Sequence, residues 1–183
     1  MKNKYCKPLL KSLFVLAVVT LTACGSDKSN SELSSIVIKV KEIKGLELEG
    51  KDYVVTLGNK SARLVNGSAE FDVESIESTV STLSTEFGEP ILASFMGSDG
   101  ELSIESSADV FVIRNPVFYG IRISDMKELS NKIRSHEQYL ELVTALEKEV
   151  VNSPCPMDIS CSMVVALIAN EIAEEIDFSD LVE

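Results

Sequence analysis

The chain has 183 residues, of which 45% are hydrophobic and 25% charged, and its 29 acidic against 17 basic residues give a formal net charge of −12. This composition is ordinary for a folded globular protein and excludes an intrinsically disordered chain. The excess of acidic residues repels phosphate backbones and anionic headgroups, so it argues against binding to nucleic acid or to a bare membrane surface.

The first 23 residues have the pattern of a secretory signal peptide. Four lysines precede an apolar run over residues 13–21, and the small residue Ala23 lies directly before Cys24. A basic start, a short apolar core and a small cleavage residue follow one another in this order in secretory signals. The apolar run is about half of the roughly 20 residues that a membrane-spanning helix needs. We therefore expect cleavage of residues 1–23 rather than a permanent span.

The ending Leu21-Thr22-Ala23-Cys24 resembles the lipobox of bacterial lipoproteins. The resemblance implies cleavage between Ala23 and Cys24, attachment of diacylglycerol to the Cys24 sulfur, and acylation of the new N-terminus, for example with palmitate. Two or more acyl chains anchor a protein stably, at about 0.8 kcal/mol per buried methylene. Gly25 stands where an aspartate would favour the inner membrane. The resemblance thus implies a lipid-anchored cell-envelope protein, held by membrane lipid through Cys24 at the outer membrane and facing the periplasm.

Two cysteines, Cys155 and Cys161, remain after Cys6 is removed with the signal and Cys24 is lipidated. An even pair in an exported chain favours a structural disulfide, and closing so short a loop would stabilise the fold by roughly 2 kcal/mol. A redox-active pair usually has two intervening residues, and a zinc site would need two further ligands in a chain with one histidine. We predict the disulfide, with catalytic and metal roles as alternatives, and no cofactor.

Two segments follow the signal peptide. The sequence predicts a flexible tether over residues 24–35 and a β-rich module over residues 36–105. The Ser-rich tether would span roughly 18 Å as a random coil. Beyond it, apolar and polar residues alternate in short runs, as in half-buried strands. The predicted strands cover 36–40, 53–57, 62–65, 69–73, 79–83, 91–95 and 102–104. Asn66-Gly67 between two runs predicts a hairpin. Residues 36–105 are thus predicted to form a small antiparallel β-sandwich.

The stretch from Leu48-Glu-Gly-Lys-Asp-Tyr-Val-Val to Asn66-Gly-Ser-Ala-Glu-Phe71 carries a second resemblance. Residues 36–105 resemble an immunoglobulin-like or carboxypeptidase-regulatory-like module. This resemblance implies the same sandwich architecture and no particular activity.

Residues 106–183 change to a helical period. Residues 108–114 predict a short helix or a last strand, ended by Asn115-Pro116. Helices are predicted after Ser124, over 137–151 and over 162–176, each with an apolar stripe that a small bundle would bury. The last stripe comprises Met163, Val164, Leu167, Ile168, Ile172 and Ile176. The predicted fold class is therefore α+β: a small antiparallel β-sandwich followed by a three-helix unit stapled by the disulfide.

Residues 115–146 carry a third resemblance, through an Asn-Pro-x-Phe corner and a Lys-Ile-x-x-His-x-x-Tyr-x-x-Leu pattern. They are similar to modules of uncharacterised proteobacterial lipoproteins. In larger proteins of this kind the unit lies ahead of further domains, so the resemblance implies a minimal or shortened version here. It adds no activity.

Catalytic equipment is sparse in this sequence. His136 is the only histidine and could act as a general base, but a hydrolase also needs a nucleophile and an orienting acid, and no Gly-x-Ser-x-Gly elbow occurs. A position at a helix end is favoured instead. Residues 98–101 lack the ligand spacing of a calcium loop and predict a turn. Acidic residues over 171–180 predict a solvated face, with a docking surface for a basic partner as the alternative.

These patterns favour a non-catalytic structural or protein-interaction role in the cell envelope, with another envelope protein as partner. No catalytic and no metal-binding residue is assigned, and the chain is interpreted as a non-enzyme with the question left open. A periplasmic small-ligand binding protein, with its pocket between sandwich and helices, is the alternative. A hydrolase is third.

Overall fold

The computed structural model describes residues 34–49, 51–73, 80–95 and 100–181. Its strands are β1 (Ser34–Val40), β2 (Val54–Leu57), β3 (Lys60–Arg63), β4 (Ser68–Val73), β5 (Val80–Ser84), β6 (Pro90–Phe95) and β7 (Glu101–Leu102). Its helices are α1 (Ile104–Ile113), α2 (Met126–Arg134), α3 (Tyr139–Asn152) and α4 (Met163–Glu175), with 3-10 turns η1 (Pro116–Phe118) and η2 (Ile123–Asp125). None of the helices in these ranges is long and apolar enough to cross a bilayer.

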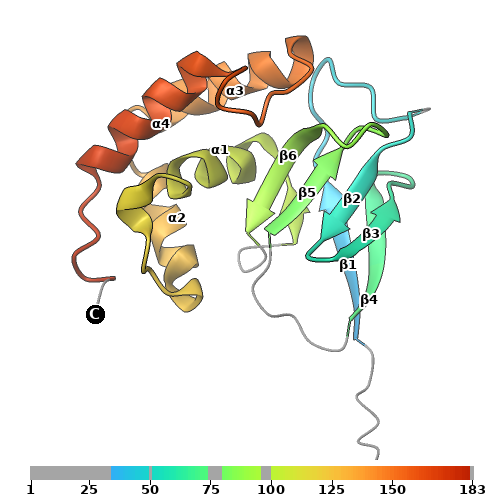
Figure 1. The fold of residues 1–183 in the computed structure, drawn as a ribbon, viewed down its shortest axis with the longest axis horizontal. Coiled ribbons are helices and arrows are strands. Elements are labelled where there is room, and N and C mark those ends of the chain that lie inside the picture. The colour runs from blue at the N-terminus through green and yellow to red at the C-terminus, as the bar shows by residue number, and fades with distance from the viewer. Residues whose placement is uncertain (1–33, 50, 74–79, 96–99, 182–183) are drawn as a thin grey trace, which may run out of the picture. The chain divides into compact units, whose positions relative to one another are not determined.

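The strands form two small sheets, with the orders β4-β1-β7 and β3-β2-β5-β6 (Figure 1). All pairs are antiparallel except β1 with β7, which run parallel. Along β1, Ile38 and Val40 are buried while Val37 and Lys39 are exposed, which is the alternation that the sequence predicted. The α+β fold class is confirmed, with small, mostly antiparallel sheets followed by helices.

The Asn66-Gly67 turn connects the two sheets. Both residues have left-handed backbone angles, with φ of 50° and 73°, as a two-residue type I′ turn requires. Val65 and Ser68 exchange both backbone hydrogen bonds across it, at 2.8 and 3.0 Å. The predicted turn is present, but β3 and β4 do not continue as a hairpin within one sheet. After this single pair, β4 pairs with β1 at six positions, while β3 pairs with β2.

Helix α1 settles the choice between helix and strand, and it begins earlier than predicted. Nine of its ten residues are buried, and a helix that is buried on nearly all sides has no exposed face to reveal its period. Ser103 caps it, since the Ser103 hydroxyl accepts from Ser106 N–H and the Ser106 hydroxyl accepts from Ser103 N–H. This capping box starts the helix at Ile104, so the predicted strand over 102–104 was too long, and β7 ends at Leu102.

The N-terminal turn of α1 closes the open edge of β6. The N–H of Ala93 donates to the Ser107 hydroxyl at 2.9 Å, and the carbonyl of Ala93 accepts from the Ser106 hydroxyl at 2.9 Å. Strand β6 is the last in its sheet, so these backbone groups have no neighbouring strand to pair with. The two serines therefore provide hydrogen-bond partners for the backbone groups of a buried strand edge, which would cost free energy if they were left unpaired.

Replacing Ser107 with Ala is expected to lower the free energy of unfolding by about 1–3 kcal/mol, because the buried N–H of Ala93 loses its acceptor. Urea denaturation monitored by circular dichroism would measure the loss. Ser61→Ala, at an exposed position of β3, serves as the control and should change stability by less than about 0.5 kcal/mol. Equal denaturation midpoints for both variants would contradict the role of Ser107.

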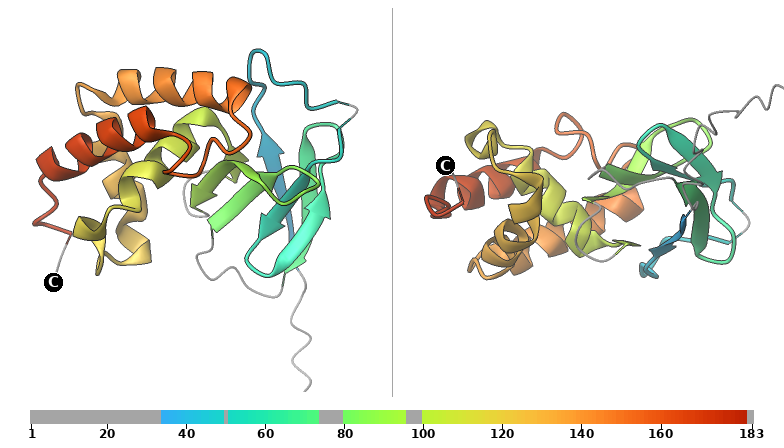
Figure 2. Two further views of the ribbon diagram at one scale, coloured as in Figure 1. Left: turned by 45° about the horizontal axis from the view of Figure 1, so that its top comes forward. Right: turned by 90° about the horizontal axis from the view of Figure 1, so that it is seen from below.

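Helices α2, α3 and α4 add their apolar faces to the core around α1. Figure 1 and Figure 2 show α1 between the strands β5 and β6 and the outer helices α3 and α4. The fully buried side chains that they contribute are Leu129, Ile133, Leu142, Leu146, Val165 and Ile172. Sheets and helices share this core, and residues Glu32–Glu183 form one compact unit. The predicted boundary between residues 105 and 106 falls within α1.

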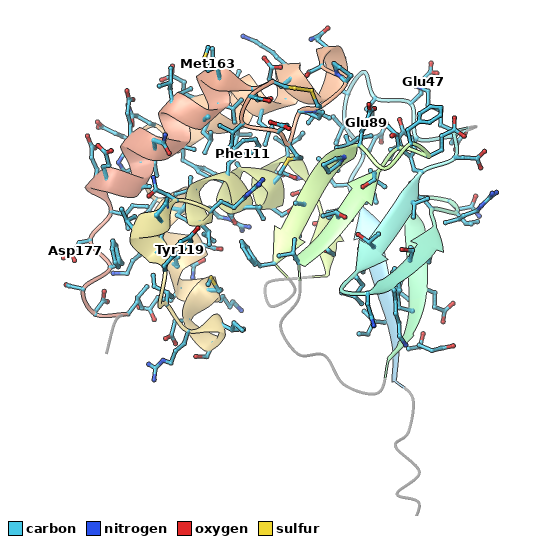
Figure 3. All side chains as sticks on the ribbon, viewed as in Figure 1. Glu47, Glu89, Phe111, Tyr119, Met163 and Asp177 are labelled. Atoms are coloured by element: carbon cyan, nitrogen blue, oxygen red, sulfur yellow. A yellow bond between two sulfur atoms is a disulfide. The ribbon has the colours of Figure 1, made fainter. Side chains whose placement is uncertain are left out.

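One predicted core stripe is partly wrong. Met163, Val164 and Leu167 are 67%, 61% and 61% exposed, and Figure 3 shows Met163 at the outer surface of α4. Ile168 and Ile172 of the predicted stripe are buried, and the helix also buries Val165 and three alanines that the stripe did not include. Both faces of its first two turns are apolar, so the sequence alone did not show which of them meets α1.

Candidate functional site

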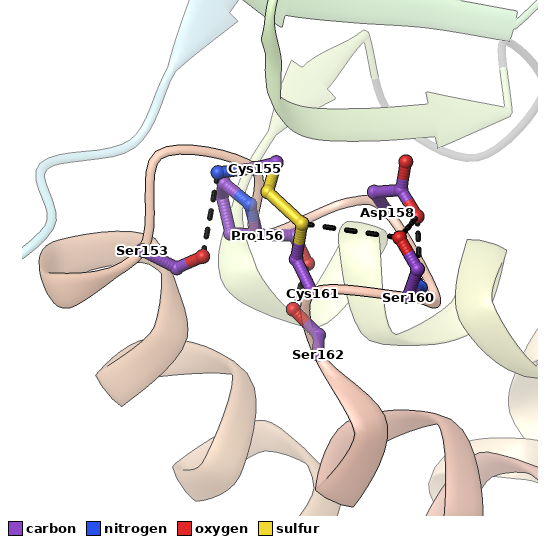
Figure 4. Close-up of a disulfide and its surroundings, with 7 residues drawn as sticks. All are labelled: Ser153, Cys155, Pro156, Asp158, Ser160, Cys161 and Ser162. Carbon is purple, nitrogen blue, oxygen red and sulfur yellow. Dashed lines mark hydrogen bonds between the residues drawn. A yellow bond between two sulfur atoms is a disulfide. The ribbon is translucent and has the colours of Figure 1, made fainter.

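The predicted lipidation and cleavage residues, Cys24 and Ala23, lie outside the described residues together with residues 1–23 and most of the tether. The predicted disulfide is present. The sulfurs of Cys155 and Cys161 are 1.95 Å apart and the Cα atoms 6.0 Å apart, in the connection between α3 and α4 (Figure 4).

The disulfide loop, residues 155–161, is held in place by polar contacts on both sides. The carboxylate of Asp158 accepts from the N–H and the hydroxyl of Ser160, at 2.8 and 2.6 Å (Figure 4). These hydrogen bonds lower the pKa of Asp158 below its ordinary value. The Ser162 hydroxyl donates to the carbonyl of Pro156 at 2.8 Å, and Met157 within the loop is buried. The disulfide loop is therefore held in one conformation by contacts within the protein.

A groove of about 680 Å³ lies between this loop, the end of α1, and strands β5 and β6 with the turn that joins them. We call it the turn–loop groove. Its apolar lining includes Val80, Pro90, Val110, Met157 and Ile159. A volume of this size falls within the range of clefts that bind ligands or peptide segments.

The turn between β5 and β6 places Phe87 on the rim of the groove. The N–H of Thr85 donates to the carbonyl of Glu89 at 2.9 Å, and Gly88 N–H donates back to the carbonyl of Thr85 at 3.0 Å. Gly88 has a left-handed φ of 83°, which favours glycine. Phe87 at the tip is 82% exposed. An aromatic ring displayed so fully beside an apolar cleft is typical of an interaction surface.

Charged groups of both signs line the groove, with acids in excess. Arg114 donates to the carbonyl of Met157 at 3.3 Å, so it ties the end of α1 to the disulfide loop, and its charge helps to lower the pKa of Asp158. Glu89 and Asp158 are exposed on the lining, and Glu86 is exposed in the adjoining turn. The rim is therefore negative overall.

A second polar cluster lies among the helices and is centred on a buried acid. Asp109 on α1 is 3% exposed, and its Oδ2 accepts from Nε and Nη2 of Arg134 at 3.0 and 2.8 Å. The Tyr139 hydroxyl donates to Oδ1 of Asp109 at 3.1 Å and also contacts the carbonyl of Glu105. Burial raises the pKa of Asp109 even though Arg134 and Tyr139 oppose the rise. Burial and the Asp109 carboxylate raise the pKa of Tyr139.

This cluster joins α1, α2 and the start of α3, with Asp109 buried and the Arg134 side chain 37% exposed at its edge, and we interpret it as structural. The sequence interpretation missed it. The available signal was a lone acid, Asp109, inside the apolar run from Ala108 to Ile113. Such a residue implies a buried partner. The partner, 25 positions further along, could not be identified without the helix packing.

His136 lies directly after the C-terminal cap of α2. Its Nδ1 accepts from the N–H of Gln138 at 3.2 Å, so the ring proton is on Nε2, which is 3.2 Å from Oε2 of Glu175. Two more members of the predicted acidic cluster also contact neighbours: Glu171 accepts from Gln138, and Asp180 accepts from Lys132. These contacts hold the C-terminal segment against the corner between α2 and α3.

The turn predicted over residues 98–101 lies only partly within the described residues. Gly100 has a left-handed φ of 64° before β7 begins, while Ser98 and Asp99 lie outside the described residues. Among the residues that are described, no three His, Cys, Asp or Glu side chains are grouped to hold a metal ion.

Comparisons with protein-family models, with curated proteins and with solved structures find no match to this chain.

Proposed function

We propose that the protein is a lipid-anchored cell-envelope protein with a non-catalytic protein-interaction role, held at the outer membrane through Cys24 and facing the periplasm. The observation that carries the proposal is the order of the N-terminal residues. A basic start and a short apolar core end in Leu21-Thr22-Ala23-Cys24, which combines an export signal with a lipid-attachment sequence.

The folded part supports an interaction role. The turn–loop groove displays an exposed aromatic ring, Phe87, above an apolar floor. The buried acid Asp109, with its partners Arg134 and Tyr139, joins helices and does not line this groove. Removing residues 1–23 removes four lysines and no acid, which leaves 13 basic against 29 acidic residues and a net charge of −16. So acidic a surface favours attachment through acyl chains over direct contact with anionic headgroups.

Replacing Cys24 with Ser is expected to abolish incorporation of radiolabelled palmitate and to remove the protein from the membrane fraction or leave it as an uncleaved precursor. Without the thiol, no diacylglyceryl group can be attached, and the stable two-chain anchor is lost. Cys6→Ser is the matched control, since Cys6 lies in the predicted signal, and it should label like the wild type. Unchanged labelling of the Cys24 variant would refute the anchor.

The small-ligand alternative also has a specific observation in its favour. The groove lies between strands and helices, where that interpretation placed its pocket, and its volume of about 680 Å³ suits a small molecule. A thermal-shift screen of a metabolite panel separates the two roles. Stabilisation by a metabolite that is lost in Phe87→Ala would favour the ligand-binding alternative.

A further inference from the structure

We propose that the turn–loop groove binds a segment of a partner protein in which apolar side chains alternate with basic ones. This inference rests on the proposed interaction role and adds its site and the chemistry of the partner. Three features of the groove carry it: exposed apolar side chains over a buried floor, a negative rim, and two walls that are held in place before binding.

The apolar side chains give the groove its binding energy. Phe87 is 82% exposed, Ile159 52% and Val80 39%, while Met157, which also lines the groove, is 3% exposed. Phe87 comes from the β5–β6 turn and Ile159 from the disulfide loop, so a segment lying in the groove would bury side chains on both walls. An aromatic anchor next to a desolvated floor is the usual composition of an interface hot spot.

The charges define the partner. Glu86, Glu89 and Asp158 are exposed on and beside the rim, whereas Arg114 is engaged with the carbonyl of Met157. The Ser160 hydrogen bonds keep Asp158 ionised over the physiological range. Lysine or arginine side chains flanking the apolar anchors of a partner would complement these carboxylates. A second copy of this acidic chain, or an anionic membrane, would be repelled.

The walls are fixed by bonds within the protein. The disulfide and the Asp158–Ser160 hydrogen bonds hold one wall, and the Thr85–Glu89 turn holds the other. Arg114 connects the loop to α1. A groove that keeps its shape in the free protein loses little conformational entropy on binding, which favours recognition of a short segment.

The test uses purified full-length protein in non-ionic detergent and three fluorescein-labelled synthetic peptides of about 12 residues, a length that covers a groove of this kind. One peptide alternates Leu with Lys, one alternates Leu with Glu, and one alternates Ser with Lys. Fluorescence anisotropy is expected to show binding of the Leu/Lys peptide at least about tenfold tighter than of either other peptide, since charge and apolar contacts are both needed.

Two variants and two matched controls connect the binding to the groove. Phe87→Ala is expected to weaken Leu/Lys binding about tenfold, and Glu89→Lys to weaken it about threefold with a smaller salt dependence. Leu140→Ala, at a side chain that is 75% exposed on α3, and Glu137→Lys should leave binding unchanged. Thermal unfolding of each variant would verify that it remains folded.

Several results would overturn the inference. Equal binding of the Leu/Glu peptide would remove the charge argument, and equal losses in Phe87→Ala and Leu140→Ala would remove the site. Self-association in light scattering that Phe87→Ala abolishes would assign the groove to a second copy. A metabolite-induced thermal shift that Phe87→Ala abolishes, without peptide binding, would assign it to a small molecule. If the peptide assay fails while the wild-type protein incorporates palmitate and Cys24→Ser does not, only the groove is refuted. If the wild-type protein binds the Leu/Lys peptide but incorporates no palmitate, only the anchor is refuted.

Discussion

Replacing Arg134 with Met is expected to lower the free energy of unfolding by about 3 kcal/mol, because it leaves the carboxylate of Asp109 buried without its counter-charge. Asp109 has a side chain that is 4% exposed, and Arg134 one that is 37% exposed. Tyr139 would still donate to Asp109, so the loss lies at the lower end of the range for a broken buried pair. Methionine keeps the apolar stem of the side chain, which confines the change to the charge.

The effect of this substitution should depend on pH with a definite sign. Burial already raises the pKa of Asp109 above its ordinary 3.8 in the wild type, and removal of Arg134 raises it further. When the pKa of an acid is higher in the folded than in the unfolded state, proton binding favours the folded state. This contribution to stability is complete below the unfolded-state pKa, and it is lost as the pH rises through the folded-state pKa. The stability difference between the variant and the wild type should therefore be larger at about pH 8 than at about pH 5.

Urea denaturation at the two pH values would measure this difference. The matched control is Arg63→Met, which removes an ion pair between Arg63 and Asp52 whose side chains are 77% and 61% exposed. Such surface pairs contribute about 0–1 kcal/mol. An Arg134 variant as stable as the Arg63 variant, or a deficit that does not change with pH, would contradict the role assigned to Asp109.

Replacing Phe111 with Ala should be the most damaging single change in α1, with an expected loss of about 3–5 kcal/mol. Phe111 is 5% exposed, and Figure 3 shows it on α1, inside the layer of helices. Truncation removes a buried aromatic ring and leaves a cavity that the surrounding elements can only partly fill. Because small domains are stable by only about 5–15 kcal/mol, a large part of the molecule's stability depends on this residue.

Phe87→Ala provides the same chemical change in the opposite environment. At 82% exposure, the ring of Phe87 contributes little to the folded core, so the variant should unfold within about 0.5 kcal/mol of the wild type. Calorimetric melting of both proteins would compare them. If Phe87→Ala destabilised the protein as much as Phe111→Ala, the ring would belong to the core and could not be an interaction residue.

The strands were largely predictable because they are half-buried. In β1, Ile38 and Val40 alternate with exposed neighbours, and this period of two appears directly in the sequence. Turn residues such as Asn66 and Gly67 marked their ends. The assignment of β3 and β4 to different sheets was not predictable, because the same turn serves strands that then choose different partners.

Helix α1 shows where local pattern stops being informative. Its residues are buried on nearly all sides because other elements surround it, so neither a period of two nor one of 3.6 stands out in its sequence. Ser103 was placed in the predicted strand over 102–104, and Ser106 and Ser107 in no predicted element. Their role as a cap and as partners of Ala93 depends on the position of β6. A polar residue in a core can be interpreted only once its partner is known.

The two parts of the candidate site differ in the same way. The spacing of Cys155 and Cys161 allowed the disulfide to be predicted from the sequence, since a pair so close in an exported chain has few alternatives. The turn–loop groove combines residues from β5, β6, α1 and the disulfide loop, segments that are up to about 80 positions apart. No local pattern marks such a groove.

The position of β1 has a mechanical consequence. This strand, the first element after the predicted tether, lies in the middle of its sheet between β4 and β7. In Figure 1 it begins at the end of the sheets that is farther from the β5–β6 turn. If the protein is held by the predicted tether and a partner in the turn–loop groove pulls on it, the force acts along β1. The hydrogen bonds of its six pairs with β4 run across the strand, so such a force shears them together, while a force that peeled the strand away would break them one at a time.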